Sequence, residues 1–329
     1  MKNTFGTSVT MTVFGESHGE AVGVVLDGVA PGIEVDENYM KACLARRAPS
    51  MTTDTARREN DEFRILSGVF SGKTTGTPIC IIVPNENQRS KDYEYGIARP
   101  AHADFSANQK YHGFEDYRGG GHFSGRVTAG IVAGGAILQK ALQDIDVTVA
   151  THISECAELH DKAFDDIKSD RLTLDCAKFP VLDEDVASGM IKAIEQAKAD
   201  GDSVGGIVET AISGIPSGVG EPWFDSVESV LSHALFSIGG VKGVEFGDGF
   251  AIVKKRGSEA NDVLEYEDGK VVVSRNSNGG INGGITNGAD VIFRCAVKPT
   301  PSISKEQNTV DFVKGENTVL SVKGRHDPA

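Results

Sequence analysis

The sequence predicts an α+β fold, and three observations support that class. Strand-like and helix-like segments are mixed along the 329 residues without the regular strand–helix alternation of a parallel sheet. No stretch rich in proline and serine separates one part of the chain from another. One strand–turn–helix pattern also occurs twice. A chain of this length can form one large domain or two, and we predict one compact, pseudo-symmetric domain over residues 1–329.

The elements of the first half follow from the spacing of apolar residues. Residues 22–27 form a predicted strand that ends in a turn containing glycine. Asp36 is the predicted N-cap of a helix that runs to about residue 47, because its side chain can accept hydrogen bonds from free amides. Residues 78–83 form a short buried strand. Residues 127–142 form a helix whose small side chains favour close packing.

The later elements follow from the same criteria. They are strands over residues 147–154, 206–213 and 291–297, helices over residues 183–199 and 226–236, and a hairpin over residues 264–273. The hairpin has Asp268-Gly269 as its two-residue turn, a pair that readily adopts the required left-handed backbone.

The repeated pattern relates the two halves of the chain. In VVLDGVAPGI, an apolar strand leads to Gly28 and Gly32, and a helix follows. In VETAISGIPSGV, an apolar strand leads to Gly214 and Gly218 at one constant offset, again before a helix. An internal duplication would produce a single pseudo-symmetric body. Chance similarity between two short units is the competing explanation.

Composition argues against several classes of protein. The net charge is −14, from 33 basic and 47 acidic residues, and general binding of nucleic acid requires the opposite sign. No run of about 18 apolar residues is present, so no membrane span is predicted. The first residues lack the apolar core of a signal peptide, and the five cysteines are scattered, so we predict a cytoplasmic protein.

A basic segment between residues 41 and 58 interrupts this acidic chain. Its charged residues are the basic Lys41, Arg46, Arg47, Arg57 and Arg58 and the acidic Asp54. A solvated helix face followed by a loop would explain the segment. Its contrast with the charge of the whole chain favours a site for a small anion.

The segment RGGGHFSGRVT, residues 118–128, is the most informative stretch of the chain. Consecutive glycines lack Cβ atoms, so their backbone can lie flat against a ligand and direct amides toward anionic oxygens. Ser124 and the two arginines add donors, and the predicted helix that follows would offer its N-terminal amides. A glycine-rich surface turn is the alternative explanation.

Two other glycine-rich segments fail as nucleotide-binding motifs. SGVFSGKTTG has three residues between its glycines where a P-loop needs four, so we interpret it as a structural turn. GGINGG lacks the surrounding βαβ unit of a dinucleotide fingerprint. No HExxH motif or Cys/His cluster is present, so no metal site is predicted.

His18 and His102 are the candidate acid–base residues among the eight histidines. His18 lies in GESHG beside Ser17, and His102 lies in RPAHADF before Asp104. Short loops framed by glycine or proline can hold an imidazole where it reaches a ligand. A lone histidine is more often structural, and we assign His152, in a predicted strand, to that class.

Two segments near the C-terminus add polar groups. KPTPSI places Lys298 and two hydroxyls at the end of a predicted strand. KGRHDPA places Arg325 and Asp327 at the end of the chain. An aspartate beside a proline commonly forms a turn, whereas beside a catalytic ring system it could act as a base.

These segments together resemble the chorismate synthase family. The matching stretches, in order, are GESHG at 15–19, RPAHAD at 99–104, RGGGHFSGR at 118–126, FSIGGVKGVEFGDGF at 236–250, NGGINGGITNG at 278–288, KPTPSI at 298–303 and KGRHDP at 323–328. The resemblance therefore covers essentially the whole chain.

The resemblance implies a fold and a reaction. The family's fold sandwiches helices between two antiparallel sheets with internal pseudo-symmetry, and its members are normally homotetramers. Its reaction is the anti-1,4-elimination of phosphate from 5-enolpyruvylshikimate 3-phosphate, which gives chorismate for aromatic amino acid biosynthesis. The family requires reduced FMN without net redox change, and NADPH is a candidate reductant.

The resemblance also implies roles for individual residues. His18 would donate a proton near the departing phosphate, and His102 would protonate or hold the reduced flavin. Asp327 would govern proton removal from the substrate ring, with Ser17 and Ser124 as relays. The residues that it places on FMN are His122, Phe123, Ser124, Gly239, Gly240, Gly283, Lys298, Pro299, Thr300, Pro301, Ser302 and Arg325. Those that it places on a phosphate of substrate or NADPH are Arg46, Arg47 and Arg126.

Several positions depart from the family pattern and bear on how anions are bound. They are Ala48 in place of a third arginine, Ala101 in place of glycine, His122 in place of arginine and Asn282 in place of leucine. The chain ends at Ala329, so we expect the C-terminal helix of the family to be absent.

Two other functions would fit similar residues. One is an FMN-dependent oxidoreductase, and the other is a non-catalytic flavin-binding protein. An oxidoreductase would oxidise reduced flavin stoichiometrically with substrate, whereas the lyase would not consume it. A binding protein would have no activity to lose when His18 and His102 are replaced.

Overall fold

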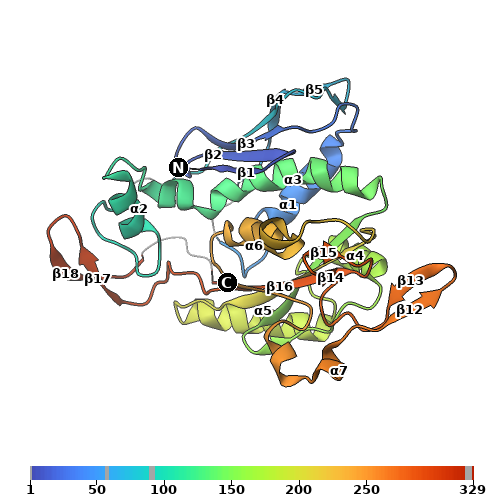
Figure 1. Ribbon diagram of the computed structural model, residues 1–329. Helices are drawn as coiled ribbons and strands as arrows, with labels where there is room; N and C mark the ends of the chain where they lie inside the picture. The colour runs from blue at the N-terminus through green and yellow to red at the C-terminus, as the bar shows by residue number, and fades with distance from the viewer. Residues whose placement is uncertain (1, 56–58, 89–92, 323–327) are drawn as a thin grey trace. The chain divides into compact units, whose positions relative to one another are not determined.

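The computed structural model contains helices and antiparallel β-sheets, as an α+β chain requires, and describes residues 2–55, 59–88, 93–322 and 328–329 (Figure 1). The strands are β1 (Thr4–Gly6), β2 (Thr10–Gly15), β3 (Ala21–Asp27), β4 (Arg64–Ser67), β5 (Val69–Phe70), β6 (Lys73–Thr74), β7 (Ile79–Pro84), β8 (Thr148–Cys156), β9 (Leu159–His160), β10 (Gly206–Ser213), β11 (Val241–Phe246), β12 (Leu264–Glu267), β13 (Lys270–Val273), β14 (Ile281–Asn282), β15 (Ile285–Thr286), β16 (Val291–Val297), β17 (Gln307–Asp311) and β18 (Glu316–Leu320). The α-helices are α1 (Glu37–Arg47), α2 (Asp104–Tyr111), α3 (Thr128–Gln143), α4 (Ile167–Cys176), α5 (Glu184–Ala199), α6 (Val227–Phe236) and α7 (Gly257–Ala260). Short 3₁₀ segments are η2 (Arg118–Phe123), η3 (Gly125–Val127), η4 (Trp223–Asp225) and η5 (Gly249–Lys254).

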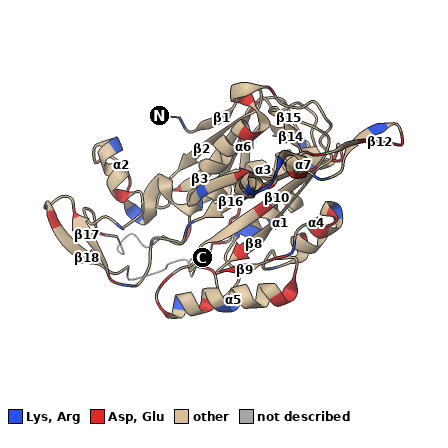
Figure 2. Ribbon diagram, turned by 60° about the horizontal axis from the view of Figure 1, so that its bottom comes forward, with Lys and Arg blue, Asp and Glu red and all other residues tan. Residues whose placement is uncertain are grey.

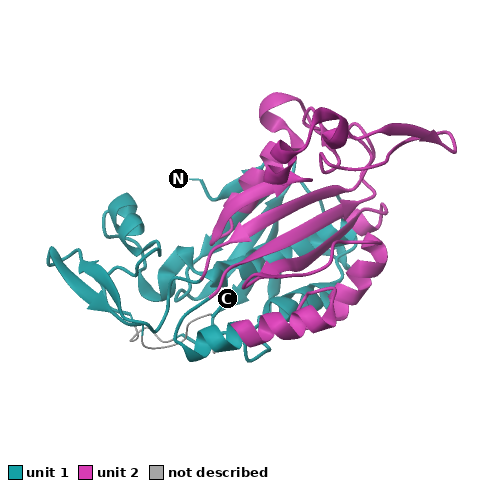
Figure 3. Cartoon of the chain, turned by 90° about the horizontal axis from the view of Figure 1, so that it is seen from below, with its two compact units in different colours: residues 1–141, 194–203, 300–329 teal, residues 142–193, 204–299 magenta. Residues whose placement is uncertain are grey.

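The chain divides into two compact units (Figure 3). Unit 1 comprises Met1–Ala141, Ile194–Ser203 and Thr300–Ala329, and unit 2 comprises Leu142–Ala193 and Val204–Pro299. Within the described residues, each unit holds a five-stranded antiparallel sheet. The single domain predicted over residues 1–329 stays a prediction.

The core of unit 1 lies between its sheet, in the order β1-β2-β3-β7-β4, and helices α1 and α3 (Figure 1). Val22, Val24 and Leu26 alternate along β3 and are fully buried, because one face of the sheet points to the helices. Helix α3 approaches β3 closely, since a Cβ atom on Gly130 would lie 2.6 Å from the carbonyl oxygen of Gly23. This contact explains why α3 is rich in small residues.

The sheet of unit 2 has the order β11-β16-β10-β8-β9. Helix α6 covers it with an apolar stripe that packs against Val291 and Phe293 of β16. Helix α4 packs on the opposite face through Ile167, which contacts Ala150 and Ala211, since Ala211 pairs with Ile292 and not with Phe293. Apolar residues on the two faces of this sheet therefore form separate clusters, one with α6 and one with α4.

The two sheets share one strand order. In unit 1, the strands β2, β3, β4 and β7 are arranged as β2-β3-β7-β4. In unit 2, the strands β8, β10, β11 and β16 are arranged as β8-β10-β16-β11, which is the same order in terms of chain sequence. Helix α1 follows β3 and helix α6 follows β10, so the repetition includes a helix.

The turn after β3 in unit 1 is held by the buried Thr74. Its hydroxyl donates to Ala30 O at 2.7 Å and accepts from Ile33 N at 3.0 Å. Its backbone N–H donates to Ile33 O at 2.9 Å, and its carbonyl accepts from Gly32 N at 2.8 Å. Four hydrogen bonds thus fix the turn that contains the second repeated glycine.

The turn after β10 in unit 2 is held in the same way by the buried Thr286. Its hydroxyl donates to Pro216 O at 2.7 Å and accepts from Val219 N at 2.9 Å. Its N–H donates to Val219 O at 2.9 Å, and its carbonyl accepts from Gly218 N at 2.8 Å. Two turns with the same four bonds, inside sheets of the same order, favour internal duplication over chance similarity.

The predicted elements are confirmed with shifts of one or two residues at their ends. Asp36 caps α1 by accepting from Asn38 N at 2.9 Å and from Tyr39 N at 3.0 Å. The segment that resembles a P-loop contains the hairpin β5–β6, whose turn residues Ser71 and Gly72 have φ values of 50° and 73°. It is a structural turn, as predicted.

Acidic residues are spread over several elements, including α5 and the β12–β13 hairpin (Figure 2). Among the described residues, no helix combines the length and the apolar character that crossing a membrane requires. All five cysteines are free.

Candidate active site

The three consecutive glycines of unit 1 adopt left-handed backbone conformations. Gly119, Gly120 and Gly121 have φ values of 60°, 80° and 53°, a region in which side-chain-bearing residues are strained. Gly121 also lies against the backbone, since a Cβ atom there would be 1.9 Å from Asp116 O. The residue type is therefore dictated by conformation as well as by space.

Adjacent glycines of this loop contact both candidate histidines. A Cβ atom on Gly119 would lie 2.6 Å from His18 Nε2 and 2.9 Å from Ser17 Oγ. A Cβ atom on Gly120 would lie 3.1 Å from His102 Cε1 and 3.2 Å from His102 Nε2. The loop thus brings together His18 and His102, which are far apart in the sequence.

His102 is oriented by a carboxylate and an arginine. Its Nδ1 lies 2.7 Å from Asp104 Oδ1 and 3.1 Å from Arg99 Nη2. Because a guanidinium can only donate, both contacts cannot be hydrogen bonds to one Nδ1, and the shorter one indicates an Nδ1–H that donates to Asp104. The Nε2 atom then remains as the basic nitrogen of a neutral ring, on the side of Gly120.

Arg99 is a site residue that the sequence analysis missed. Its Nε donates to Asp104 Oδ2 at 2.8 Å, and its Nη2 donates to Asp104 Oδ1 at 2.8 Å. Burial alone would raise the pKa of Asp104, but the hydrogen bonds from Arg99 and His102 outweigh it and hold that pKa well below its ordinary value. Arg99 stands in RPAHAD, so its motif was recognised while its partners were not.

A cavity of about 250 Å³ lies beside this arginine. Its lining includes Arg99, Asp104, Tyr93, Tyr95, Tyr117 and Phe312, all in unit 1. The guanidinium carbon of Arg99 lies 5.6 Å from the centre of the Tyr93 ring. Glu94 and Glu115 also line the cavity, and aromatic walls with a few charged groups are typical of a small-molecule site.

His18 and Ser17 are buried, with 6% and 0% of their surfaces exposed. The His18 ring meets Tyr93 edge to face, with ring centres 5.4 Å apart. The backbone N–H of Ser17 donates to Gly121 O at 3.0 Å, which ties GESHG to the glycine loop. His18 therefore lies between an aromatic ring and the glycine loop.

The residues after the glycines have distinct contacts. His122 Nδ1 lies 2.8 Å from Gly15 O, and because a carbonyl only accepts, this nitrogen carries the proton. Phe123 is 43% exposed. Ser124 caps η3 by accepting from Arg126 N at 3.3 Å. The Ser124 hydroxyl thus has a structural bond as well as its predicted relay role.

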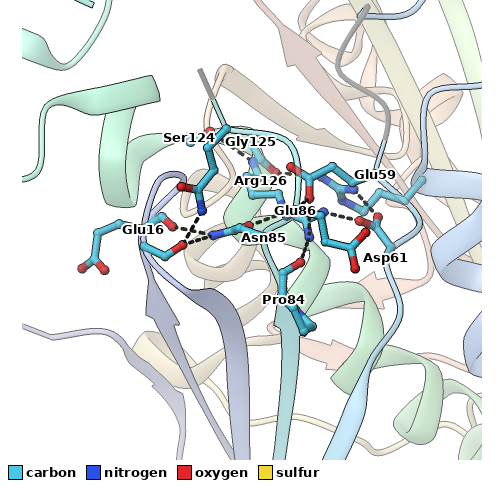
Figure 4. A network of polar contacts seen from close by, with 12 residues as sticks. Glu16, Glu59, Asp61, Pro84, Asn85, Glu86, Ser124, Gly125 and Arg126 are labelled. Atoms are coloured by element: carbon cyan, nitrogen blue, oxygen red, sulfur yellow. Dashed lines mark hydrogen bonds and ion pairs between the residues drawn. The ribbon is translucent and has the colours of Figure 1, made fainter. Parts of the chain in front are cut away.

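Two arginines predicted to bind phosphate, Arg47 and Arg126, converge on the buried Asp61, and Figure 4 shows Arg126 beside it. Arg47 Nη1 donates to Asp61 Oδ2 at 2.6 Å, and Arg126 Nη1 donates to Asp61 Oδ1. Arg126 Nη2 also lies 3.5 Å from Glu59 Oε2. Carboxylates therefore already compensate the charges of both arginines. Arg46, on the same helix as Arg47, is exposed.

Unit 2 holds a second group of predicted residues. The backbone N–H of Lys298 donates to Gly240 O at 2.9 Å, directly after β16. Partial burial and the charge of Lys242 lower the pKa of Lys298. Gly239 and Gly283 have open space where a Cβ atom would stand. An anion would relieve the repulsion between the two lysines.

The remaining predicted residues fall in three places. Pro299 is the last residue of its segment in unit 2, and Thr300, Pro301 and Ser302 belong to unit 1. Ser302 Oγ accepts from Arg99 Nη1 at 3.2 Å. Asp327 and Arg325, together with Arg57 and Arg58 of the basic segment, lie outside the described residues.

A metal centre has no candidate in this arrangement. In the part of the chain that the structure describes, no group of three or more His, Cys, Asp or Glu side chains is placed to hold a metal ion.

The chain is similar to known proteins over nearly its whole length. The chorismate synthase family matches residues 9–329. A chorismate synthase of Cytophaga hutchinsonii is 45% identical over 336 residues, which cover 100% of this chain and 91% of that protein. One of Methanosarcina mazei is 45% identical over 333 residues, 99% of this chain and 90% of that protein. A crystal structure of a chorismate synthase has a TM-score of 0.74 at 27% identity, covering 89% of this chain and 85% of that one.

Proposed function

This chain belongs to the chorismate synthase family, and we propose how its residues serve the reaction of that family. It is an enzyme, a carbon–oxygen lyase of the shikimate pathway. It converts 5-enolpyruvylshikimate 3-phosphate into chorismate and phosphate, a step of aromatic amino acid biosynthesis. The family depends on reduced FMN, although the reaction has no net redox change.

The observation that carries the proposed site is the contact of adjacent glycines with His18 and His102. An elimination of phosphate needs a proton donor for the leaving group, and two imidazoles at one bare loop can serve a single ligand. We assign proton donation near the departing phosphate to His18. We assign a contact with the reduced flavin to His102, whose ring is held by Asp104.

The loop of unit 1 has features that suit a flat cofactor. The glycine backbone presents no side chain, and the exposed Phe123 follows it. When bound, reduced FMN supplies an electron-rich ring that assists departure of the phosphate. We propose that His122, Phe123, Ser124 and Ser302 contact the cofactor from unit 1.

Unit 2 contributes its own proposed contacts with FMN. Lys298 is the central candidate, because the neighbouring Lys242 makes its site favourable for an anion. Gly239, Gly240 and Gly283 are further candidates, because no side chain of their own covers their backbone. Pro299 of unit 2 and Thr300 and Pro301 of unit 1 complete the proposed set in KPTPSI.

Phosphate binding is proposed for Arg46, Arg47 and Arg126, as the resemblance implies. For Arg47 and Arg126, a phosphate would compete with Asp61 or bind beside it. NADPH as the reductant, with a contact at Arg47, is part of the same proposal. Proton removal assisted by Asp327, with Arg325 on the cofactor and Ser17 and Ser124 as relays, also remains proposed.

We further propose a homotetramer built from single sandwich-like subunits, as the family implies. Large apolar side chains are highly exposed in unit 2, with Trp223, Phe224 and Phe250 at 85%, 92% and 81%. Exposure of several aromatic residues is typical of a surface that another subunit covers. A cytoplasmic location is proposed as well, and the five free cysteines agree with a reducing compartment.

The proposed function is tested by anaerobic phosphate release from the enolpyruvyl substrate, with and without reduced FMN. We expect stoichiometric phosphate and chorismate only when reduced FMN is present, and no net loss of reduced flavin. Stoichiometric oxidation of the flavin would instead indicate an oxidoreductase. Flavin binding without phosphate release would indicate a binding protein.

A further inference from the structure

We propose that Asn85 is a positioning residue that holds the turn carrying Ser17 and His18. Asn85 directly follows β7 and lies at the centre of the polar network in Figure 4. The inference rests on the proposed role of His18. It assigns to Asn85 no contact with substrate or cofactor, only the placement of the residue that makes such contacts.

The carboxamide of Asn85 links the two ends of that turn. Its Nδ2 donates to Glu16 O at 3.0 Å and to Gly19 O at 2.9 Å. The backbone N–H of Gly19 also donates to Glu16 O at 3.0 Å, which closes the turn around Ser17 and His18. Both N–H groups of the amide are therefore used on the carbonyls that bracket the candidate acid.

The orientation of this amide is set by Arg126. Arg126 Nε donates to Asn85 Oδ1 at 2.8 Å, and an arginine can only donate. A flipped amide would place N–H against N–H at Arg126 and oxygen against oxygen at Glu16 and Gly19. Only one orientation satisfies all three contacts, so the side chain cannot turn without losing them.

Arg126 is itself immobilised. Its guanidinium is 4% exposed, is paired with Asp61, and donates through Nη2 to Pro84 O at 2.9 Å. The backbone N–H of Asn85 donates to Glu20 O at 3.0 Å, just beyond the turn. The end of β7, the buried carboxylate of Asp61 and GESHG are thereby joined through one arginine and one asparagine.

This connection matters because the His18 ring must keep its position relative to the glycine loop. Gly119 lies close beside the ring, since a Cβ atom there would be 2.6 Å from His18 Nε2. A misplacement of about 1 Å at a reacting group can cost on the order of 10²-fold in rate. Loss of the two Asn85 donor bonds would release the turn and allow such a displacement.

The test compares Asn85→Asp with the matched control Gln88→Ala. Asn85→Asp keeps the shape and the acceptor for Arg126 but replaces both donor bonds by oxygen–oxygen repulsion. Gln88 is exposed and also donates to Gly19 O, at 2.8 Å, so its truncation removes a bond to the same carbonyl without touching Arg126. Asn85→Ser shortens the side chain, so that it can no longer donate to both carbonyls, and it adds no charge. This variant is used if Asn85→Asp does not fold.

Three quantities are measured in the full-length protein: hydrogen exchange at the amides of Ser17 and Gly19, the single-turnover rate at saturating substrate and reduced FMN, and the steady-state KM for the substrate. For either Asn85 variant we expect exchange at least about 10-fold faster at these amides and a rate lowered by roughly 10–100-fold, with KM nearly unchanged. The Gln88 control should change none of these quantities by more than a few-fold.

Exchange at Ser17 and Gly19 that matches wild type in the Asn85 variants would overturn the inference, whatever the rate. Faster exchange with a wild-type rate would also overturn it, because the turn would then not need to be held for turnover. The role of His18 is tested separately by His18→Ala. If that variant retains the wild-type rate, the assignment of His18 fails while the exchange result for Asn85 still stands.

Discussion

The two candidate histidines differ in what surrounds them, and this difference suits different tasks. His102 faces Asp104, whose carboxylate stays ionised because of Arg99, so its ring has a fixed Nδ1–H and an available Nε2. His18 is buried against Tyr93 and the glycine loop. A ring held by an ion pair is well placed to orient a ligand. A buried ring beside the bare glycine loop is well placed to reach a ligand bound at that loop.

Replacing either histidine should slow the reaction without unfolding the protein. For His18→Ala and His102→Ala we expect turnover to fall by about 10²–10⁴-fold, the usual contribution of a positioned acid–base group. His160→Ala is the control, because the side chain of His160 is 69% exposed and far along the chain from both motifs. Single-turnover phosphate release measures the effect, and circular dichroism checks the fold. Rates within a few-fold of wild type for both variants would return these histidines to a structural role.

A methyl group on Gly119 should displace His18. Gly119→Ala forces a side chain into a backbone with φ of 60° and places its Cβ 2.6 Å from His18 Nε2. We expect a loss of roughly 1–3 kcal/mol in the free energy of unfolding and a lower rate. Gly125→Ala is the matched control in the same loop, because no atom lies within 4 Å of its Cβ position. Urea unfolding and single-turnover rates distinguish the two variants, and equal behaviour would contradict the close contact at Gly119.

At the residue scale, contiguous motifs could be predicted from the sequence, whereas contacts between residues far apart in the chain could not. GESHG, RPAHAD and the glycine loop are local patterns, so His18 and His102 were predicted directly. Asp61 and Asn85 were not, because they meet Arg126 across separations of 65 and 41 residues. Nothing in the local pattern of either residue indicates such a partner. The same holds for the pairing of Arg47 with Asp61, which only the fold reveals.

At the element scale, the predicted segments were those with regular apolar spacing and good caps. Asp36 and Ser226 each accept a hydrogen bond from amides of the helix they precede. Helix α2 was missed because its N-cap residue, Ala103, makes no side-chain cap and its face is mostly polar. The hairpin β17–β18 was missed because its strands are polar and largely exposed. Such elements depend on tertiary contacts rather than on local preference.

The threonine turns allow a prediction about the repeated element. Thr74→Val and Thr286→Val each remove a buried hydroxyl that donates once and accepts once. We expect each to lower the free energy of unfolding by about 1–3 kcal/mol, since the former partners lose their bonds. Thr75→Val is the control, because Thr75 is exposed and its hydroxyl bonds locally, to the hydroxyl of Thr77 at 2.7 Å and from Thr77 N at 3.4 Å. Urea titration measures all three, and a large loss for one threonine with none for the other would argue against equivalent turns.

At the scale of the whole molecule, a net charge of −14 coexists with a proposed site for anionic ligands. The two facts are compatible because acidic and basic side chains are paired locally in the structure. In unit 2, the residues His152, Glu209, Arg294 and Glu245 stand opposite one another on β8, β10, β16 and β11. Their signs alternate across the sheet if His152 is protonated. His152 was predicted to be an ordinary structural residue, because neither carboxylate that flanks it is adjacent in the chain.

The geometry around His152 favours a charged ring. Its Nδ1 lies 2.6 Å from Asp161 Oδ2 and its Nε2 lies 3.1 Å from Glu209 Oε2, while a neutral imidazole has only one N–H to donate. Burial lowers the pKa of His152, but the hydrogen bonds to Glu209 and Asp161 and the charges of both outweigh it, so the pKa is raised. Arg294 faces Glu209 at 3.7 Å on the next strand, and Phe164 covers the ring.

This raised pKa predicts how the stability of the protein depends on pH. A group whose pKa is higher in the folded state stabilises the protein fully at pH values below its pKa in the unfolded state, about 6.5. This contribution to the free energy of unfolding is lost as the pH rises through the pKa of the folded state. The difference in free energy of unfolding between wild type and His152→Gln should therefore be largest near pH 6 and shrink as pH increases. His160→Gln, at the exposed histidine, should show a small difference that pH hardly changes. Urea titrations at a series of pH values measure both, and a wild-type advantage over His152→Gln that stays constant to pH 9 would show that His152 does not carry this proton.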